Sequence, residues 1–465
     1  MTMGVFLCVQ SQEDLSGLIA RPMELAEILQ RQGTNCLLAS KYATEPGLYT
    51  MEALMINLQN EFVRRRDAHL GVWILSGIAI RLAMRQGYHR DPERYPQISV
   101  YHGEMRRRMW ACIIQLDGLT SYQLGLPPMV QERQCDTRLP RNLFDEDFGP
   151  ESTHLPASRP DTEVTPVLYL ITKSELSRVF RQVVAQVSLG HTDNYDDIIS
   201  LHHRLYSARD SISPRFRMAD LKSCVTVAPY ILVRRYTLEL LFQKTLVILH
   251  RHHMAKALRD RTYEVSRQAC VGAAMAILSH KADLARESRP GAILYGKGWV
   301  LSSIEQSDFL LASAVVCLEL SFRAREATHS AGPSSMESTP SSYSQTDLIN
   351  VLQQSHQLLD SLKDTSTDCR QAFNTLSFML RKSNARGQLG GSNGHGPQPP
   401  NAPTDCIEPG QTFEFGECDL SELNNDLRTA DLMKHRQCLC RELPSSGLAD
   451  EFDGNIWSGI NRFHL

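Results

Sequence analysis

Apolar residues recur at helical spacing over most of the stretch from Met51 to Leu320. The first strong pattern places apolar residues three and four apart, which predicts a helix with one buried face: Leu70, Trp73, Ile74, Gly77, Ile78 and Leu82. Gly87 then stands where a left-handed residue would end that helix. A second helix is predicted from Glu104 with this apolar stripe: Met105, Met109, Cys112, Leu116 and Leu119. Gly125 and the Pro127-Pro128 pair end it.

Later segments repeat the same helical pattern. One helix is predicted to begin at Pro166, a favourable first-turn residue. Others are predicted over 195–212, from Pro229 to about 250–253, over 266–282 and over 308–322. The 266–282 segment is rich in alanine and glycine, which lets a neighbouring helix approach closely. Because alternating strand patterns are nearly absent, we predict an all-α fold: a large multi-helix bundle with disordered linkers and a C-terminal tail.

Composition divides the chain into six predicted parts. Residues 1–35 form an N-terminal remnant, and 36–324 form the main helical domain. A Ser/Thr/Pro-rich linker follows over 325–345, then a helical extension over 346–382. Residues 383–412 are Gly/Pro/Asn-rich, which predicts disorder. The tail, 413–465, mixes acidic and bulky apolar residues, which is typical of activation segments and equally of a tail that docks on the bundle.

The overall charge and the cysteines restrict the class of protein. The 465 residues carry a formal net charge of -3, so bulk charge does not favour nucleic acid, and DNA affinity would need a local patch or another module. The 12 cysteines are scattered and form no CxxC pair, which favours a reducing intracellular setting. No secretory signal is recognised. The apolar stretch from Pro229 to Leu249 contains Arg234, Glu239 and Lys244, which indicates a buried helix and no membrane span.

Several short motifs have a plainer structural interpretation. Segment 291–297 matches the start of a phosphate-binding loop, but Gly298 replaces the hydroxyl residue and no strand precedes it, so we interpret the match as coincidental. The run His250-Arg-His-His253 favours a polar helix end over a metal site, because adjacent histidines point in different directions.

The basic clusters 64–66 and 106–108 have acidic residues four positions earlier, at Glu61 and Glu104. This spacing favours salt bridges over DNA contacts or an import signal, most strongly for 106–108. No hydrolase, metalloprotease, dinucleotide or paired-carboxylate signature is found. We therefore predict no enzyme, and no catalytic, cofactor-binding or metal-binding residues.

One long stretch extends the interpretation further. The segment from Trp73 to Pro92 closely resembles the central motif of the fungal-specific transcription factor domain, the middle homology region of zinc-cluster regulators. The segment from Glu104 to Trp110, followed by Asp117 and Gly125-Leu-Pro127, resembles that family's second hallmark. Blocks at 136–145, 201–206, 249–251, 266–270 and 308–312 are similar to family blocks in the same order. The resemblance covers roughly residues 36 to 320.

The resemblance marks a set of residues as structural: Trp73, Gly77, Arg81, Gly87, His89, Arg90, Asp91, Glu104, Arg106, Arg107, Trp110, Asp117, Gly125 and Pro127. Gly77 would let a helix pack near the backbone, and Gly87 would supply a positive φ. Trp73 and Trp110 would be large core anchors.

The resemblance also implies a nuclear regulator of a metabolic or secondary-metabolite gene set. Family members place a two-zinc, six-cysteine cluster and a dimerising helix ahead of this domain, and the spacing of that cluster is not found in this sequence. Zinc is therefore expected only for an upstream cluster, and promoter DNA only through an upstream module or a partner. The family pattern implies a homo- or heterodimer, with the transcription machinery as a partner of the C-terminal tail and a small-molecule effector as a further partner.

Two other hypotheses remain open at this point. One is a DNA-free helical interaction protein that modulates a related full-length regulator. The other is a small-molecule sensor, which a helical bundle can build around an apolar pocket; an enzyme ranks below it because no catalytic signature is found.

Overall fold

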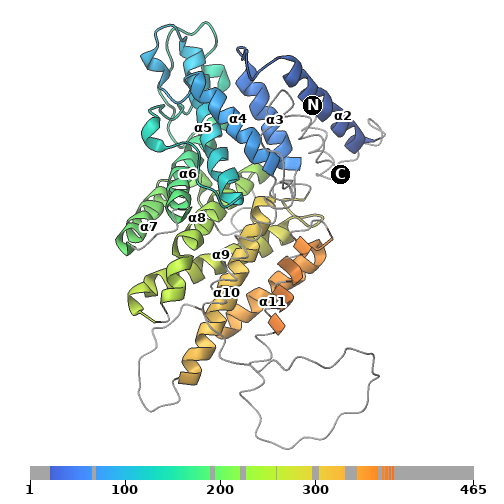
Figure 1. Ribbon diagram of the computed structural model, residues 1–465, viewed down its shortest axis with the longest axis vertical. Coiled ribbons are helices and arrows are strands. Elements are labelled where there is room, and N and C mark those ends of the chain that lie inside the picture. Colours follow the sequence, from blue (N-terminus) through green and yellow to red (C-terminus); the bar gives the residue numbers. More distant parts are fainter. Residues whose placement is uncertain are drawn as a thin grey trace, which may run out of the picture.

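The computed structural model describes residues 21–64, 70–188, 194–219, 227–257, 259–295, 303–329 and 343–364, and further residues between 369 and 381. Within these residues the chain is helical and contains no strand (Figure 1). The α-helices are α2 (Pro22–Ala39), α3 (Thr50–Arg64), α4 (Leu70–Arg85), α5 (Val100–Gln123), α6 (Pro166–Ser188), α7 (Tyr195–Asp210), α8 (Pro229–Lys256), α9 (Glu264–Glu287), α10 (Ser303–His329) and α11 (Gln345–Leu362). The prediction of an all-α fold is confirmed.

Glycine, proline and serine set several helix ends at the expected places. Gly87 has a φ of 79° just after α4, and Gly125 has a φ of 67° just after α5. A left-handed residue at this position ends a helix without a Cβ clash, as predicted for Gly87. Pro166 is the first residue of α6. Ser344 caps α11 in a reciprocal capping box with Asp347.

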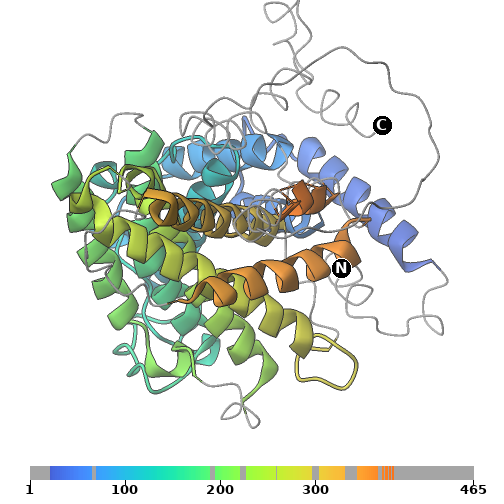
Figure 2. The same ribbon diagram turned by 90° about the horizontal axis from the view of Figure 1, so that it is seen from below.

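Two hydrophobic cores lie along the molecule. The smaller core is built by α2, α3, α4 and the first part of α5, and it contains Trp110, Ile113 and Leu116. The larger core is built by α6 to α11, and the end of α5 reaches it through Leu119. Figure 1 shows α2 to α4 at one end and α8 to α11 at the other; Figure 2 looks along the line between these two ends, from below. Helix α5 therefore belongs to both cores.

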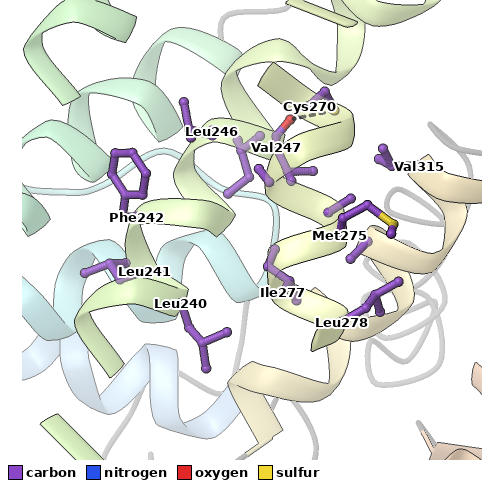
Figure 3. Close-up of a cluster of buried hydrophobic side chains, with 14 of the residues drawn as sticks. Leu240, Leu241, Phe242, Leu246, Val247, Cys270, Met275, Ile277, Leu278 and Val315 are labelled. Atoms are coloured by element: carbon purple, nitrogen blue, oxygen red, sulfur yellow. Dashed lines mark hydrogen bonds between the residues drawn. The ribbon is translucent and has the colours of Figure 1, made fainter. Parts of the chain in front are cut away.

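The pair α8–α9 forms the centre of the larger core. Val247 of α8 faces Cys270 of α9, whose Sγ lies 3.9 Å from the Val247 carbonyl oxygen, whereas Phe242 points to the other side of α8 (Figure 3). Ala273 and Ala274 are buried at this contact, as expected of small residues that let helices approach. Gly272 differs from the prediction, because a Cβ added there would meet nothing within 4 Å. The alanines, and not this glycine, provide the close approach.

The buried faces of α4 and α5 differ from the predicted ones. In α4 the fully buried apolar residues include Val72, Leu75 and Ile80, whereas Trp73 is only half-buried and Ile74 is 37% exposed. Trp73 is therefore not a core anchor, while Trp110 is, at 2% exposed. Because α4 is apolar on nearly every side, its periodicity does not select one face.

In the first half of α5, charged residues occupy buried positions that the apolar pattern did not indicate. Glu104 and Arg107 are buried, and Met105 and Met109 are only partly so. Here buried ion pairs override the apolar stripe that the sequence predicts.

Several predicted boundaries also shift. Helix α2 runs through the predicted start of the main domain at residue 36, and α10 continues into the predicted linker as far as His329. Helix α5 begins at Val100, before Glu104. The predicted segments 383–412 and 413–465 lie outside the described residues, as does the predicted Glu61–Arg65 pair. Among the described helices, none combines the length and the apolar character that crossing a membrane requires.

Candidate functional site

The turn between α4 and α5 is held by a buried ion pair. Arg107 donates two hydrogen bonds to Asp91, from Nε at 3.1 Å and from Nη2 at 2.7 Å. Asp91 also caps the short helix η1 (Pro92–Arg94) by accepting the Glu93 N–H. Burial opposes ionisation of Asp91, but Arg107 and the N–H groups of Arg138 and Glu93 outweigh it and lower its pKa to about 2. This carboxylate stays charged at neutral pH.

A second buried carboxylate lies one turn before Arg107 on α5. Glu104 accepts the backbone N–H of Arg141 at 3.0 Å. Its Oε1 lies 3.5 Å from Arg108 Nε, the predicted pairing at four-residue spacing, and its Oε2 lies 3.9 Å from Arg107 Nη1. Burial is the largest influence and raises the pKa of Glu104, because its arginines lie farther away than Arg107 lies from Asp91.

A third buried carboxylate lies where α5 passes from one core to the other. Asp117 accepts the N–H groups of Met129 at 2.9 Å and Val130 at 3.0 Å. Arg181 of α6 lies 3.5 Å from it and donates to the Val130 carbonyl. The arginine reaches this position by crossing over Gly118, where an added Cβ would lie 2.6 Å from Arg181 Cγ. Burial again raises the pKa of Asp117.

These three carboxylates share one structural feature. Each accepts backbone N–H groups from the irregular connection 126–141 that follows α5. Asp136 lies in the connection itself and makes the reverse contact. Its carboxylate accepts the Asp91 N–H at 2.9 Å. We call Asp91, Glu104, Asp117, Asp136, Arg107 and Arg181 the carboxylate clamp. Because irregular backbone has no ladder to satisfy its N–H groups, the clamp supplies acceptors that the connection would otherwise lack.

Other predicted residues lie around the clamp. Arg106 donates to the Gln86 carbonyl at 2.9 Å and lies over the Tyr88 ring. His89 lies beside Trp110, with ring centroids 6.3 Å apart, and burial lowers its pKa. Arg90 and Arg94 both approach Asp136, at 3.7 and 2.8 Å. The predicted salt-bridge role of the 106–108 cluster is therefore confirmed for Arg107 and Arg108.

Four further predicted residues also lie outside the clamp. Gly77 is buried on α4 and faces Met129, whose Sδ would lie 3.4 Å from an added Cβ. Trp73 is half-buried, whereas Arg81 and Pro127 are exposed. The common structural role of the whole predicted set remains a prediction.

Sequence reasoning missed parts of this arrangement. Arg181 was not singled out, because a single arginine in an amphipathic helix carries no signal of burial. Asn142 falls within the 136–145 family block, but no role of its own was predicted for it. It is buried and donates to the carbonyls of Arg159, Pro160 and Glu163. The one sequence feature that pointed to a structural role for Asn142 is its position after Leu139-Pro140, in the connection between two helices.

A second polar cluster contains part of the histidine run. His250 and His253 lie in the last two turns of α8, which ends at Lys256, as the prediction of a helix end requires. Both side chains are nevertheless fully buried. His250 Nε2 lies 2.9 Å from His202 Nδ1, and His250 Nδ1 lies 2.9 Å from Ser266 Oγ. Ser266 Oγ lies 3.0 Å from the Tyr195 hydroxyl. The larger core encloses this hydrogen-bonded chain.

The Ser266–His250 contact has the outline of a nucleophile and a base, but its environment does not suit catalysis. Both side chains are fully buried. Burial lowers the pKa of His250 to about 3, which makes it a weak proton acceptor. A substrate cannot reach Ser266 in this arrangement. The geometry favours a structural role for the pair.

The described residues offer no other recognised chemistry. Among them no group of three or more His, Cys, Asp or Glu side chains is placed to hold a metal ion. In the segment resembling a phosphate-binding loop, α9 ends at Glu287 and Gly291 lies in a turn with a φ of 85°. A helix and not a strand precedes it, in agreement with a coincidental match.

Comparison with known proteins gives a consistent answer. The profile described as "Fungal specific transcription factor domain" matches residues 37–218. The chain is 34% identical to the Zn(2)-C6 fungal-type transcription factor pigI of Monascus ruber, over 80% of this chain and 45% of that protein. It is 37% identical to the Zn(2)-C6 fungal-type transcription factor mpsB of Macrophomina phaseolina, over 75% of this chain and 46% of that protein.

A third relative adds a gene cluster to the comparison. The pyrrolocin cluster transcription factor fsdR of a fungal species is 38% identical, over 66% of this chain and 40% of that protein. The chain thus spans less than half the length of each of these three relatives. No solved structure matches the chain.

Proposed function

Because residues 37–218 of this chain carry the fungal specific transcription factor domain, we propose that the chain is the regulatory body of a transcription regulator. The observation that carries the proposal is the similarity to named transcription factors over 66% to 80% of the chain. The printed name of one relative, a pyrrolocin cluster factor, favours a secondary-metabolite gene set as the target.

The proposed role of the carboxylate clamp is structural. The clamp lies wholly inside the matched region, and it connects the smaller core, the connection 126–141 and, through Arg181, the larger core. The carboxylates of the clamp are engaged by backbone N–H groups and arginines, which favours a structural role, although Glu104 Oε2 and Arg181 Nε are buried without a hydrogen-bond partner. We assign to the clamp the task of fixing the two cores relative to each other, as a rigid regulatory body requires.

The chain's contact with DNA is proposed to be indirect. The relatives are named for a Zn(2)-C6 cluster, but the described cysteines do not fit one: Cys36, Cys112, Cys270 and Cys317 lie on four different helices. In this proposal promoter DNA and zinc belong to another module or to a partner chain. Nuclear action, dimer formation and contact of the C-terminal tail with the transcription machinery are parts of the same proposal.

The proposal does not include catalysis. The described Ser–His pair is buried and lacks a usable base, and the relatives bear the names of regulators. A structural role for the Ser266–His250 pair fits a regulatory domain, which does not need a catalytic site.

A fusion experiment tests the proposal. The full chain is joined to an unrelated DNA-binding module, and a reporter gene carrying that module's site is measured in a filamentous fungus. We expect the fusion to change reporter output several-fold relative to the module alone. The variant Arg107→Gln should lose the effect because the clamp fails, whereas Arg94→Gln, at an exposed pair, should keep it.

A folded, nuclear fusion with no effect on the reporter would refute regulation by this chain. Equal output from both variants would instead refute the assigned role of the clamp.

A further inference from the structure

A chain of hydrogen bonds runs from His202 through His250 and Ser266 to Tyr195. It begins and ends on the same helix, α7, and we call it the ring. Tyr195 and His202 both belong to α7 and lie seven residues apart, on the same face of that helix. Between them the chain passes through His250 of α8 and Ser266 of α9. Helix α7 is thus fastened at two points to the pair of helices at the centre of the larger core.

Apart from this ring, α7 is held by three fully buried apolar residues, Ile198, Leu201 and Leu205. Near the end of α7, Arg209 lies 3.5 Å from Glu239 of α8. Tyr206 and Arg209 also pack on the Phe242 ring. The ring therefore fastens the first half of α7, and the contacts with Glu239 and Phe242 fasten its end.

The hydrogen bonds of the ring can run in either of two orders. In one order, His250 Nε2–H donates to His202 Nδ1, and the Tyr195 and Ser266 hydroxyls donate toward His250. In the other, His202 Nδ1–H donates to His250, and His250 Nδ1–H donates to Ser266. Both orders need one facing ring nitrogen without a proton. One added proton can be held on His202 Nε2 with the ring intact, because His202 Nδ1–H still donates to His250. Protonation of both histidines places hydrogens on both facing nitrogens and breaks the ring.

Among the described residues, no carboxylate acts on the histidine pair, and the Tyr206 ring lies against His202 with centroids 4.7 Å apart. The charged or titratable groups that act on His250 are His202 and His253, and the one that acts on His202 is His203. All of them disfavour protonation. From α9, Glu264 and Arg267 pair with each other at 3.8 Å, and Arg267 also pairs with Glu319 of α10. Burial, the largest influence, lowers the pKa values of both His202 and His250.

His202 is the entry point for a proton, because it is only partly buried whereas His250 is fully buried. A proton taken up there remains beside the uncharged His250 in a region without a carboxylate partner. Undocking of α7 exposes both histidines to water, where they bind protons near their ordinary pKa. Acid conditions therefore favour the undocked state.

We propose that the ring of His202, His250, Ser266 and Tyr195 is an acid-sensitive latch, which holds α7 on α8 and α9 at neutral pH and releases it when both histidines take up protons. The release is local, since α7 carries few buried residues of its own. The latch gives the regulatory body a conformational response to pH that does not require a ligand.

Hydrogen exchange of the whole chain tests the latch. Backbone exchange of α7 and α6 is measured by mass spectrometry at pH 7.5, 6.5 and 5.5 and corrected for the intrinsic pH dependence. We expect the opening equilibrium of α7 to rise by at least about fivefold between pH 6.5 and 5.5, because each histidine of ordinary pKa near 6.5 that binds its proton only on opening contributes about that factor. The exchange of α6 should change little.

Two variants make the test specific. His202→Asn keeps an amide at the position of Nδ1 but cannot bind a proton, so His250 is left as the one titrating group of the ring and the rise in α7 opening between pH 6.5 and 5.5 should be smaller. His203→Asn changes the neighbouring histidine, which lies outside the ring, and should behave like the unmodified chain. Tyr195→Phe opens the ring without altering a histidine, and it should release α7 more readily at every pH.

Two results would overturn the proposal. One is an α7 opening equilibrium in the unmodified chain that does not change with pH, or that changes in step with α6. The other is a His202→Asn chain whose α7 opens with the same pH dependence as before.

Discussion

The guanidinium of Arg107 binds Asp91 through two hydrogen bonds, of 3.1 and 2.7 Å, across the turn that joins α4 to α5. Both side chains are about 5% exposed. Paired contacts of this kind match the planar fork of arginine to the two oxygens of a carboxylate. Since Asp91 also accepts the Arg138 N–H, the pair holds the turn and the connection 126–141 together.

Removal of Arg107 should therefore be costly. Arg107→Gln leaves the Asp91 carboxylate buried without its charge partner, and such changes cost about 3–5 kcal/mol of unfolding free energy. Urea denaturation followed by circular dichroism measures this change. Arg107→Lys should lose a large part of the same stability, because an ammonium group cannot make the paired contact.

The matched control lies nearby on the surface. Arg94→Gln removes a 2.8 Å ion pair with Asp136, but the Arg94 side chain is 67% exposed. Surface pairs contribute about 0–1 kcal/mol. If Arg94→Gln proved as destabilising as Arg107→Gln, burial of the clamp would not explain its strength.

The crossing of α5 and α6 leads to a second prediction. Gly118→Ala places a methyl group 2.6 Å from Arg181 Cγ, so the arginine must leave its place over α5. Overpacking of this kind costs about 1–3 kcal/mol. The same substitution at Gly272 of α9 meets nothing within 4 Å and should stabilise the chain by about 0.5–1 kcal/mol through helix propensity. The two thermal unfolding midpoints should therefore move in opposite directions.

The contrast between these glycines shows where sequence reasoning succeeds and where it stops. Gly87, Gly125 and Pro166 mark helix ends through local backbone chemistry, which the sequence contains directly. Gly118 and Gly272 both lie inside helices and look equivalent in sequence. The difference between them arises from Arg181, more than sixty residues from Gly118, and no local pattern reports that contact.

The clamp was accessible to sequence reasoning only in part. Asp91, Glu104, Arg107 and Asp117 were identified through resemblance to a family, whereas the apolar stripe indicated Met105 and Met109 as the buried face of α5. The groups that bind the carboxylates are largely backbone N–H groups of the connection 126–141. Every residue has an N–H, so the identity of residues 129, 138 and 141 gives no sign of this role.

A third prediction concerns the turn after α4. Gly87 has a φ of 79°, and a residue with a Cβ adopts this conformation at a cost of about 1–2 kcal/mol. Gly87→Ala should lower the unfolding free energy by that amount, and Gly87→Asn should lower it less, because asparagine tolerates left-handed backbone better. Equal losses for the two variants would indicate that steric contact with neighbours, and not backbone strain, is what requires glycine.

The last prediction concerns the pH dependence of global stability, which differs for the histidines and for the clamp. Burial and two neighbouring histidines lower the pKa of His250 to about 3, from an ordinary 6.5. The unfolded chain then binds the proton first, so stability is lost as the pH falls below 6.5, by about 2 kcal/mol at pH 5 for this one group. Asp91 contributes in a lower window, because its pKa moves from 3.8 to about 2 and its stabilisation is lost only as the pH falls through that range.

Urea unfolding at pH 7, 6 and 5 separates the two contributions. The unmodified chain should lose stability steadily over this interval. His250→Gln should be less stable at pH 7, since it loses ring contacts, but its stability should depend less on pH. Asp91→Asn should be destabilised by a similar amount at all three values, since Asp91 stays ionised throughout. A His250→Gln chain with an undiminished slope would show that His250 does not bind the proton responsible, and would move the acid sensitivity to His202 or His280, whose pKa values burial also lowers.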